Sequence, residues 1–206
     1  MNPSAIAARR AVVATIAAVM VGAPALLRAA PQTGARAAQT WRQLEASRWI
    51  ADGDAGAARV VYVFTDPNCP YCTKFWSDAR PWVDGGKVLL RHVMVGILAP
   101  TSPGKAAALL AAADPAAALA AYERGQLGEA RQTIGSGRPQ PLQGGSLQPL
   151  PGIPPTLRAQ LDANRQLMAA LGLAGTPGIV WRNAKGEVQA RTGAPDAALP
   201  EILGPR

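Results

Sequence analysis

Two cysteines separated by two residues, Cys69 and Cys72, constrain this chain more than any other feature because of what surrounds them. Residues 59–64 (RVVYVF) are a continuous run of mainly β-branched and aromatic residues, which predicts a strand buried on both faces. Residues 65–68 (TDPN) predict a turn, and from Cys69 to Val83 apolar residues recur at helical spacing. The sequence therefore predicts a strand, a tight turn and a helix that opens with the first cysteine.

The position of Cys69 at the start of that helix favours a reactive thiolate. Unpaired backbone N–H groups and the helix dipole stabilise an anion there, so the thiol ionises near neutral pH and can attack a substrate disulfide. Cys72 lies one turn inside the helix, within bonding reach, and is expected to resolve the mixed disulfide and release the substrate. Pro70 suits the first helical turn, where its missing N–H costs nothing. The pair is therefore predicted to be redox-active.

Two cysteines at this spacing could also be a structural disulfide, half of a zinc site or a chance pair. A structural disulfide would close so small a loop that it restricts the unfolded chain very little. A zinc site needs two more ligands, for which the chain offers its single histidine, His92, and carboxylates. The rival function is that of a non-catalytic binding or carrier protein that holds a soft metal through the two thiols.

The remaining patterns predict an α/β domain around this motif. Residues 87–95 (KVLLRHVMV) predict a second apolar strand, and a β-α-β unit of this length favours a parallel, right-handed crossover. The other predicted elements are, in chain order, helical residues 102–125 divided by an N-cap at Asp114 and by Pro115, a surface loop at 135–155, a helix at 156–171, a hairpin at 178–181 and 187–192, and a short helix at 197–203.

A proline directly precedes the predicted hairpin, in the sequence Gly175-Thr176-Pro177. Because proline has no N–H to donate to a strand ladder, it marks either the entry to the strand or a cis peptide bond. A trans proline in an ordinary loop is the alternative.

The N-terminal 37 residues predict a secretory signal peptide. Arg9 and Arg10 precede an uncharged, mostly apolar run at 11–27, which is short and alanine-rich for a membrane span. Small-x-small cleavage sites occur at 23–25 and 35–37, and an uncleaved anchor is the alternative. In either case the rest of the chain is expected to leave the cytoplasm.

The chain is then divided into three parts. A signal peptide is expected at 1–37, and a linker helix within 38–58, where residues 41–50 have an amphipathic pattern. Residues 59–206 are expected to form the catalytic domain.

Composition argues against several classes of protein. Two cysteines cannot build a disulfide-dense scaffold, and one histidine leaves little for a His-based metal cluster, so we expect neither a metal nor a cofactor. The formal charge of +8 comes from basic residues spread along the chain, without a basic run or interleaved aromatic residues. Nucleic acid is therefore not an expected partner.

The segment from Val61 to Trp76, with its Cys-Pro-Tyr-Cys motif, resembles the active-site segment of the DsbC/DsbG family of periplasmic thiol:disulfide interchange proteins. Further matching segments are VGI at 95–97, SPGKA at 102–106, DPAAA at 114–118, GTP at 175–177 and KGE at 185–187. The resemblance covers residues 41–204. It implies a thioredoxin fold with a helical insertion between the second and third core strands, and a location in the periplasm.

The resemblance also implies roles for individual residues and for partners. Cys69 would be the nucleophile, Cys72 the resolving thiol, and Pro177 a cis-proline that faces the pair. Thr176 would pair its backbone with a bound substrate chain, and Pro70 and Tyr71 would contribute to the same substrate-binding surface. The implied partners are cysteine-containing periplasmic proteins and a membrane redox partner of the DsbD type.

One departure from the family concerns the N-terminus. Family members carry a dimerisation domain before a linker helix, whereas here the linker-like helix follows the predicted signal almost directly. We therefore expect a monomer that acts as a reductase or an oxidase rather than as an isomerase.

Overall fold

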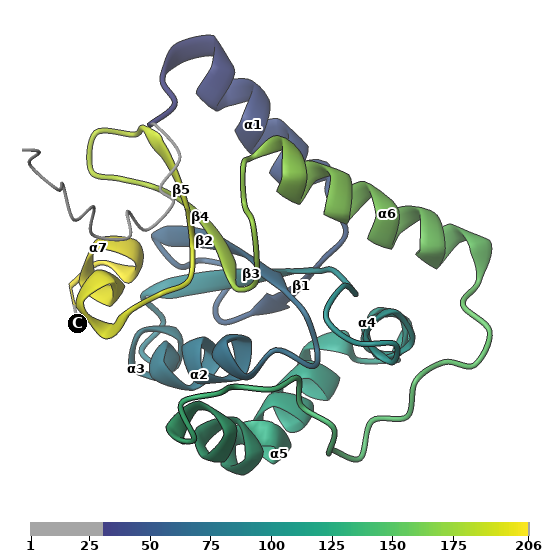
Figure 1. Cartoon of the computed structure of the whole chain (residues 1–206). Coiled ribbons are helices and arrows are strands. Elements are labelled where there is room, and N and C mark those ends of the chain that lie inside the picture. Colours follow the sequence, from purple (N-terminus) through teal and green to yellow (C-terminus); the bar gives the residue numbers. More distant parts are fainter. Residues whose placement is uncertain (1–30, 206) are drawn as a thin grey trace, which may run out of the picture.

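The computed structural model describes residues 31–205, which form a five-stranded mixed sheet with helices on both faces (Figure 1). The strands are β1 (Trp49–Asp52), β2 (Arg59–Thr65), β3 (Val88–Met94), β4 (Gly178–Arg182) and β5 (Val188–Thr192). The helices are α1 (Gly34–Ala46), α2 (Pro70–Asp78), α3 (Arg80–Val83), α4 (Ser102–Ala111), α5 (Pro115–Gly135), α6 (Pro155–Ala170), the 3-10 helix η1 (Asp196–Ala198) and α7 (Leu199–Leu203).

The sheet has the strand order β1-β3-β2-β4-β5, which puts the strand before the cysteine pair at its centre. β2 and β3 are parallel, with Val61 opposite Leu90, and this confirms the predicted β-α-β unit. β4 pairs antiparallel with both β2 and β5, so the predicted hairpin is also confirmed. Because β2 is flanked on both sides, the turn that follows it is anchored to the middle of the sheet.

The two faces of the sheet bury alternate residues of β2. Val61 and Val63 pack on α2, α3 and α7, whereas Tyr62 and Phe64 pack on α1 and α6. Successive side chains of a strand point to opposite faces, so a run of apolar and aromatic residues is what a strand covered on both sides requires.

Three helices, α4, α5 and α6, lie between β3 and β4 in the chain and confirm the predicted helical insertion. Asp114 caps α5 by accepting a hydrogen bond from the backbone N–H of Ala117 at 3.0 Å, as predicted. α5 runs on to Gly135, past the predicted end of that helical stretch at 125. A buried apolar cluster joins the insertion to the sheet through Ile50 and Met94.

The prediction of a helix at 41–50 is wrong in its bounds. α1 begins at Gly34 and ends at Ala46, and residues 49–52 form the edge strand β1, in which Ile50 pairs with His92 of β3. A strand of four residues is too short to show a clear alternation of apolar and polar residues, so its sequence was interpreted as a continuation of the preceding helix. The structure thus gives 38–58 a helix and a strand, rather than a helix and a break.

The predicted signal peptide falls mostly outside the described residues, which begin at Pro31. The second cleavage site, 35–37, lies within the first turn of α1, where Ala37 is buried. The cleavage position stays a prediction.

The helix predicted from Cys69 to Val83 is two helices, because α2 ends at Asp78 and α3 begins at Arg80. Pro81 is the physical reason, since it cannot donate a backbone hydrogen bond to the preceding turn. The break lies away from the cysteines and leaves the start of α2 as predicted.

Candidate active site

Cys69 is the N-cap of α2, and its side chain takes part in the cap. The Cys69 sulfur accepts a hydrogen bond from the backbone N–H of Cys72 at 3.2 Å, which satisfies one of the unpaired donors of the first turn. Both cysteines are free thiols, and each is only 2% exposed. The structure therefore brings the two thiols together at a helix N-terminus, as the sequence predicted.

The loop before β4 lies against this helix start. The Thr176–Pro177 peptide bond is cis, which confirms that prediction for Pro177. The Cys69 thiol donates a hydrogen bond to the backbone carbonyl of Thr176 at 3.3 Å, although 107 residues separate the two. Cys69, Thr176 and Pro177 thus form one site.

The two thiols differ in how easily they ionise. Burial opposes ionisation of Cys69, but interactions with the Cys72 thiol, the Thr176 side chain and the backbone N–H of Cys72 outweigh burial and lower the pKa of Cys69. For Cys72, complete burial, the hydrogen bond with Cys69 and the charge of Cys69 all raise the pKa well above its ordinary value. The reduced pair therefore carries its negative charge on Cys69.

Asp66 holds the turn that leads to Cys69. Its buried carboxylate accepts four hydrogen bonds: from the backbone N–H groups of Asn68, Ile97 and Leu98, and from the Ser102 hydroxyl, at 2.6–3.0 Å. These donors come from the β2–α2 turn, the loop after β3 and the start of α4. One carboxylate thus fixes the cysteine turn to the neighbouring loop.

The helical insertion also supports this turn. The Tyr122 hydroxyl of α5 donates to the backbone carbonyl of Pro67 at 2.8 Å and accepts hydrogen bonds from the Lys105 ammonium and the Gln126 amide, both at 3.2 Å. Lys105 and Gln126 also donate to the carbonyl of Gly144 in the loop before α6. A buried polar cluster therefore joins the insertion and its loop to the residues before Cys69.

A groove of about 420 Å³ runs beside the site, between α2, the cis-proline loop and the segment after β5. Its apolar lining includes Tyr71, Phe75, Pro177, Ala194 and Pro195. Tyr71 is 45% exposed, which is high for so large an aromatic side chain beside a buried pair. Predicted residues Tyr71, Thr176 and Pro177 thus line one surface, whereas Pro70 is buried.

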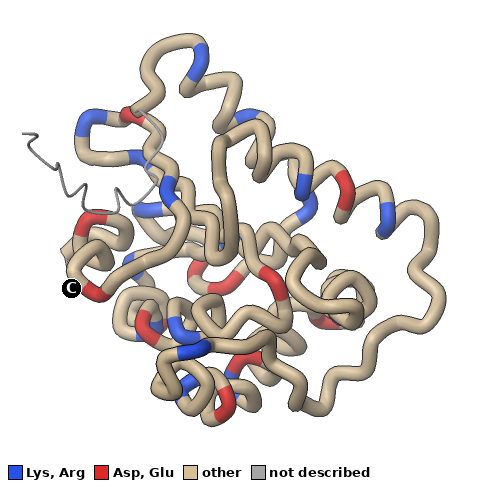
Figure 2. The backbone as a smooth tube through the Cα atoms, in the orientation of Figure 1, with Lys and Arg blue, Asp and Glu red and all other residues tan. Residues whose placement is uncertain are grey.

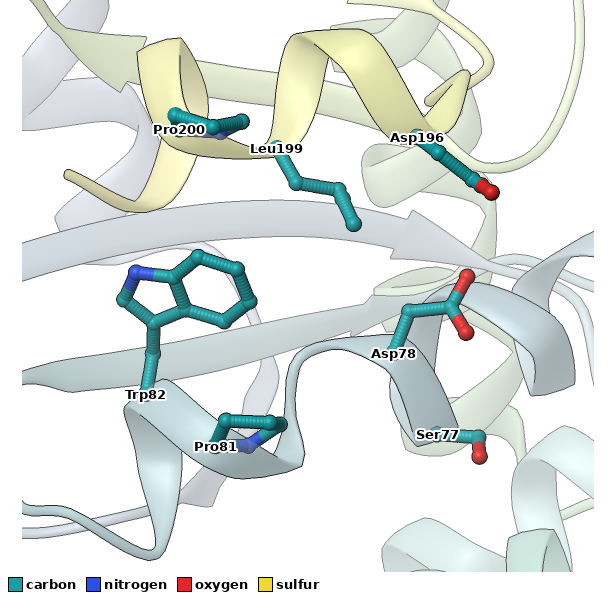
Figure 3. A pocket seen from close by; sticks show the side chains of 7 residues that line it. All are labelled: Ser77, Asp78, Pro81, Trp82, Asp196, Leu199 and Pro200. Atoms are coloured by element: carbon teal, nitrogen blue, oxygen red, sulfur yellow. The ribbon is translucent and has the colours of Figure 1, made fainter. Parts of the chain in front are cut away.

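A second cavity, of about 400 Å³, lies where α2 and α3 face η1 and α7 (Figure 3). Trp82 and Leu199 form its apolar part, and Asp78 and Asp196 approach each other across its opening. The Lys74 ammonium pairs with both carboxylates, at 2.5 and 2.6 Å. Neither the cysteines nor Thr176 and Pro177 line this cavity, so we attribute the two acids to an ion-pair link between α2 and η1.

Within residues 31–205, His, Cys, Asp and Glu side chains do not gather in any group of three or more that could hold a metal ion. A soft metal bound here would depend on the Cys69 and Cys72 sulfurs and on ligands from elsewhere. Figure 2 shows basic and acidic residues interspersed along the chain.

Sequence reasoning missed three residues that support the start of α2: Asp66, Tyr122 and Glu123, whose carboxylate accepts a hydrogen bond from the Thr73 hydroxyl of α2. Asp66 looked like an ordinary turn residue, and only the approach of the loop after β3 reveals its four bonds. Glu123, buried in α5, belongs to no motif, because it stands in an alanine-rich helix with no clear polar face.

Comparison with known proteins places this geometry in a family. The thioredoxin-like domain family matches residues 52–203, from β1 to the end of α7. The chain belongs to this family. The thioredoxin fold predicted from the sequence is thereby confirmed, with the cysteine pair at the start of the helix after its central strand.

The relatives of this thioredoxin-like domain include two proteins named thiol:disulfide interchange protein DsbG. The one from Pseudomonas aeruginosa is 51% identical over 171 residues, which are 82% of this chain, and the one from Escherichia coli is 38% identical over 169 residues, which are 80% of it. The chain spans 60% of the length of each. It is thus DsbG-like, as the resemblance of its motifs implied.

Among solved structures, the catalytic domain of Proteus mirabilis ScsC is similar with a TM-score of 0.58 and 22% identity, covering 81% of this chain and 93% of that one. A periplasmic thioredoxin-like protein from Salmonella enterica serovar Typhimurium has a TM-score of 0.58 and 18% identity, covering 80% of this chain and 94% of that one. At these sequence identities, both similarities support the assignment of the fold.

Proposed function

We propose that this domain is a periplasmic thiol:disulfide oxidoreductase that exchanges disulfides with protein substrates through Cys69 and Cys72. The observation that carries the proposal is the unequal placement of two free thiols at the N-terminus of α2: the Cys69 sulfur is at the N-cap and accepts a hydrogen bond from the backbone N–H of Cys72, which lies inside the first turn. Such asymmetry gives the pair one nucleophile and one thiol held in reserve.

The exchange proceeds in two displacements. The Cys69 thiolate attacks one sulfur of a substrate disulfide, the substrate S–S bond breaks, and the second substrate sulfur leaves as a thiolate. Cys72 then loses its proton and attacks the Cys69 sulfur, which releases the first substrate sulfur. Two electrons pass from the pair to the substrate, and the reverse sequence oxidises a dithiol.

The substrate chain is proposed to lie along the cis-proline loop. Thr176 would pair its backbone with the substrate, while Pro177, Pro70 and Tyr71 would shape the surface on which the cysteine-flanking residues rest. The groove of about 420 Å³ supports this placement, because it is mainly apolar and is lined by Thr176, whose backbone carbonyl accepts the hydrogen bond of the Cys69 thiol.

The proposed partners are cysteine-containing periplasmic proteins and a membrane redox partner of the DsbD type. The DsbG relatives, which are named thiol:disulfide interchange proteins, support the proposed class of substrate. Within residues 31–205, none of the helices has the length and apolar character that crossing a membrane requires. Nucleic acid is not proposed as a partner, since basic and acidic residues are interspersed along the chain (Figure 2).

The domain is further proposed to act as a monomeric reductase or oxidase rather than as an isomerase. α1 supports this proposal, because its apolar side is used within the domain: Leu44 is fully buried, and the Trp41 and Tyr62 rings meet edge to face at 5.2 Å. Light scattering is expected to give a monomer mass. Recovery of scrambled ribonuclease is expected to be slow, and a stable dimer with fast recovery would contradict the proposal.

Reduction of insulin disulfides, driven by a small-molecule dithiol, tests the activity itself. The wild-type protein is expected to accelerate insulin precipitation, and Cys69→Ser to leave only the uncatalysed rate. Activity that persists in Cys69→Ser would overturn the proposal, as would a wild-type protein that retains a soft metal and reduces no insulin.

A further inference from the structure

The residues just before α1 are built into the edge of the sheet. Gln32 forms an antiparallel bridge with Val188 of β5, in which the backbone N–H of each residue donates to the carbonyl of the other at 2.9 Å (Figure 1). The Gln32 side chain accepts a hydrogen bond of 2.6 Å from the Thr40 hydroxyl of α1, and both residues are buried. One residue thus joins the beginning of the described chain to the sheet and to the helix.

The bridge covers part of an open edge. β5 is the last strand of the sheet, so among the strands of residues 31–205 only β4 pairs with it. Outward-facing N–H and carbonyl groups of an edge strand pair readily with another chain when they are left open. Gln32 satisfies both of these groups of Val188.

The first turn of α1 belongs to the core as well. Thr33 is the N-cap of this helix, and its carbonyl accepts a hydrogen bond from the backbone N–H of Ala37 at 3.4 Å. Ala37 is 7% exposed and packs in the apolar cluster that contains Tyr62 and Val188. Removal of residues 31–37 would therefore take away a strand bridge, an N-cap and a buried side chain together.

A cut after Ala37 would remove all of these contacts from the mature domain. We propose that the signal peptide is instead removed after Ala25, at the small-x-small site 23–25 that precedes the described residues, and that residues 31–37 belong to the mature domain. A signal peptidase adds water across the Ala25–Leu26 peptide bond, which leaves a carboxylate on Ala25 and an α-amino group on Leu26. This processing site rests on the periplasmic location in the proposed function.

The sequence around the two sites supports this choice. Residues 11–21 are an uncharged apolar stretch whose length is typical of the apolar region of a signal peptide, roughly 7–15 residues, and the first site follows closely. Arg28 and Pro31 lie between that stretch and the second site at 35–37. Only a cut at the second site removes residues that the domain packs.

The test is the N-terminal residue of the mature protein. The whole chain is produced with its own signal peptide and a C-terminal tag, purified from cells, and analysed by mass spectrometry. We expect the mature chain to begin at Leu26. A chain that begins at Ala38, at Met1 or at any other residue would overturn the assignment. Since this measurement needs no turnover, its outcome is distinguishable from a failure of the proposed activity, which the insulin assay reports.

Two single substitutions locate the cut independently. Ala25→Tyr puts a large side chain directly before the first cut and is expected to abolish the chain that begins at Leu26. Ala35→Tyr is the matched control, because it disrupts the second site at an exposed position of α1 and is expected to leave the N-terminus at Leu26. The reverse pattern would assign the cut to the second site and overturn the proposal.

Urea unfolding tests the structural reason for the choice. A chain shortened to begin at Ala38 lacks the bridge to Val188 and the N-cap of α1. Its folding equilibrium constant is expected to be about tenfold lower, or lower still, than that of the mature protein. A shortened chain as stable as the mature protein would overturn the argument that residues 31–37 belong to the domain.

Discussion

Replacing Glu123 by glutamine is predicted to stabilise the domain, and to do so more at alkaline than at acidic pH. Burial raises the pKa of this carboxyl from 4.5 to about 7. At 1.36 kcal/mol per pKa unit, ionising it in the folded state costs about 3 kcal/mol relative to the unfolded chain. Since the folded state holds the proton more tightly, stability falls as pH rises from 4.5 to about 7, and the full cost applies above that range.

Urea unfolding of the wild type and of Glu123→Gln at about pH 5 and about pH 8.5 measures this effect. At the lower pH less than about 1 kcal/mol of the cost is present, so the difference there reports mainly how well the amide packs and bonds. The unfolding free energy of the variant minus that of the wild type is therefore expected to be about 2 kcal/mol larger at the higher pH than at the lower pH. A difference that does not change with pH would refute the reasoning. An equal gain in Glu45→Gln, which removes the same charge from an exposed position on α1, would refute it too.

Three further predictions concern the residues around the pair. On raising the pH, the first thiolate is expected to appear below the ordinary thiol pKa, to persist in Cys72→Ser and to vanish in Cys69→Ser; the opposite pattern would assign the nucleophile to Cys72. Asp66→Ala leaves four donors without their acceptor and is expected to lower the free energy of unfolding by at least about 2 kcal/mol in urea, so a neutral effect would contradict its anchoring role. Tyr122→Phe removes the bond to the Pro67 carbonyl and is expected to cost about 1–2 kcal/mol in the same assay; a variant as stable as the wild type would show that the insertion does not support the turn.

Much of the fold was predictable because it depends on local patterns. The apolar run of β2, the helix start at Cys69 and the proline before β4 each have a nearby physical cause, and each lies where the sequence placed it. The strand β1 was not predictable, since four residues at a sheet edge take their conformation from β3 rather than from their own spacing.

The two cysteines of the site were predictable from the sequence, but the residues that hold their turn and helix in place were not. Asp66 and Tyr122 act on the turn through partners more than thirty residues away in the chain, and Glu123 reaches α2 from within the helical insertion. Contacts of this kind arise only when the insertion folds back on the helix start, and no periodicity marks them. The sequence therefore indicated which thiols react but not what sets their ionisation.

Capture of a mixed disulfide tests the central claim most directly, that Cys69 attacks a substrate disulfide and Cys72 resolves the product. Reduced Cys72→Ala is incubated with a peptide that contains one disulfide, and the adduct is located by peptide mapping. The account predicts a stable adduct on Cys69, and none on Cys72 when Cys69→Ala is treated in the same way. An adduct on Cys72 in Cys69→Ala, or no adduct in Cys72→Ala, would contradict it.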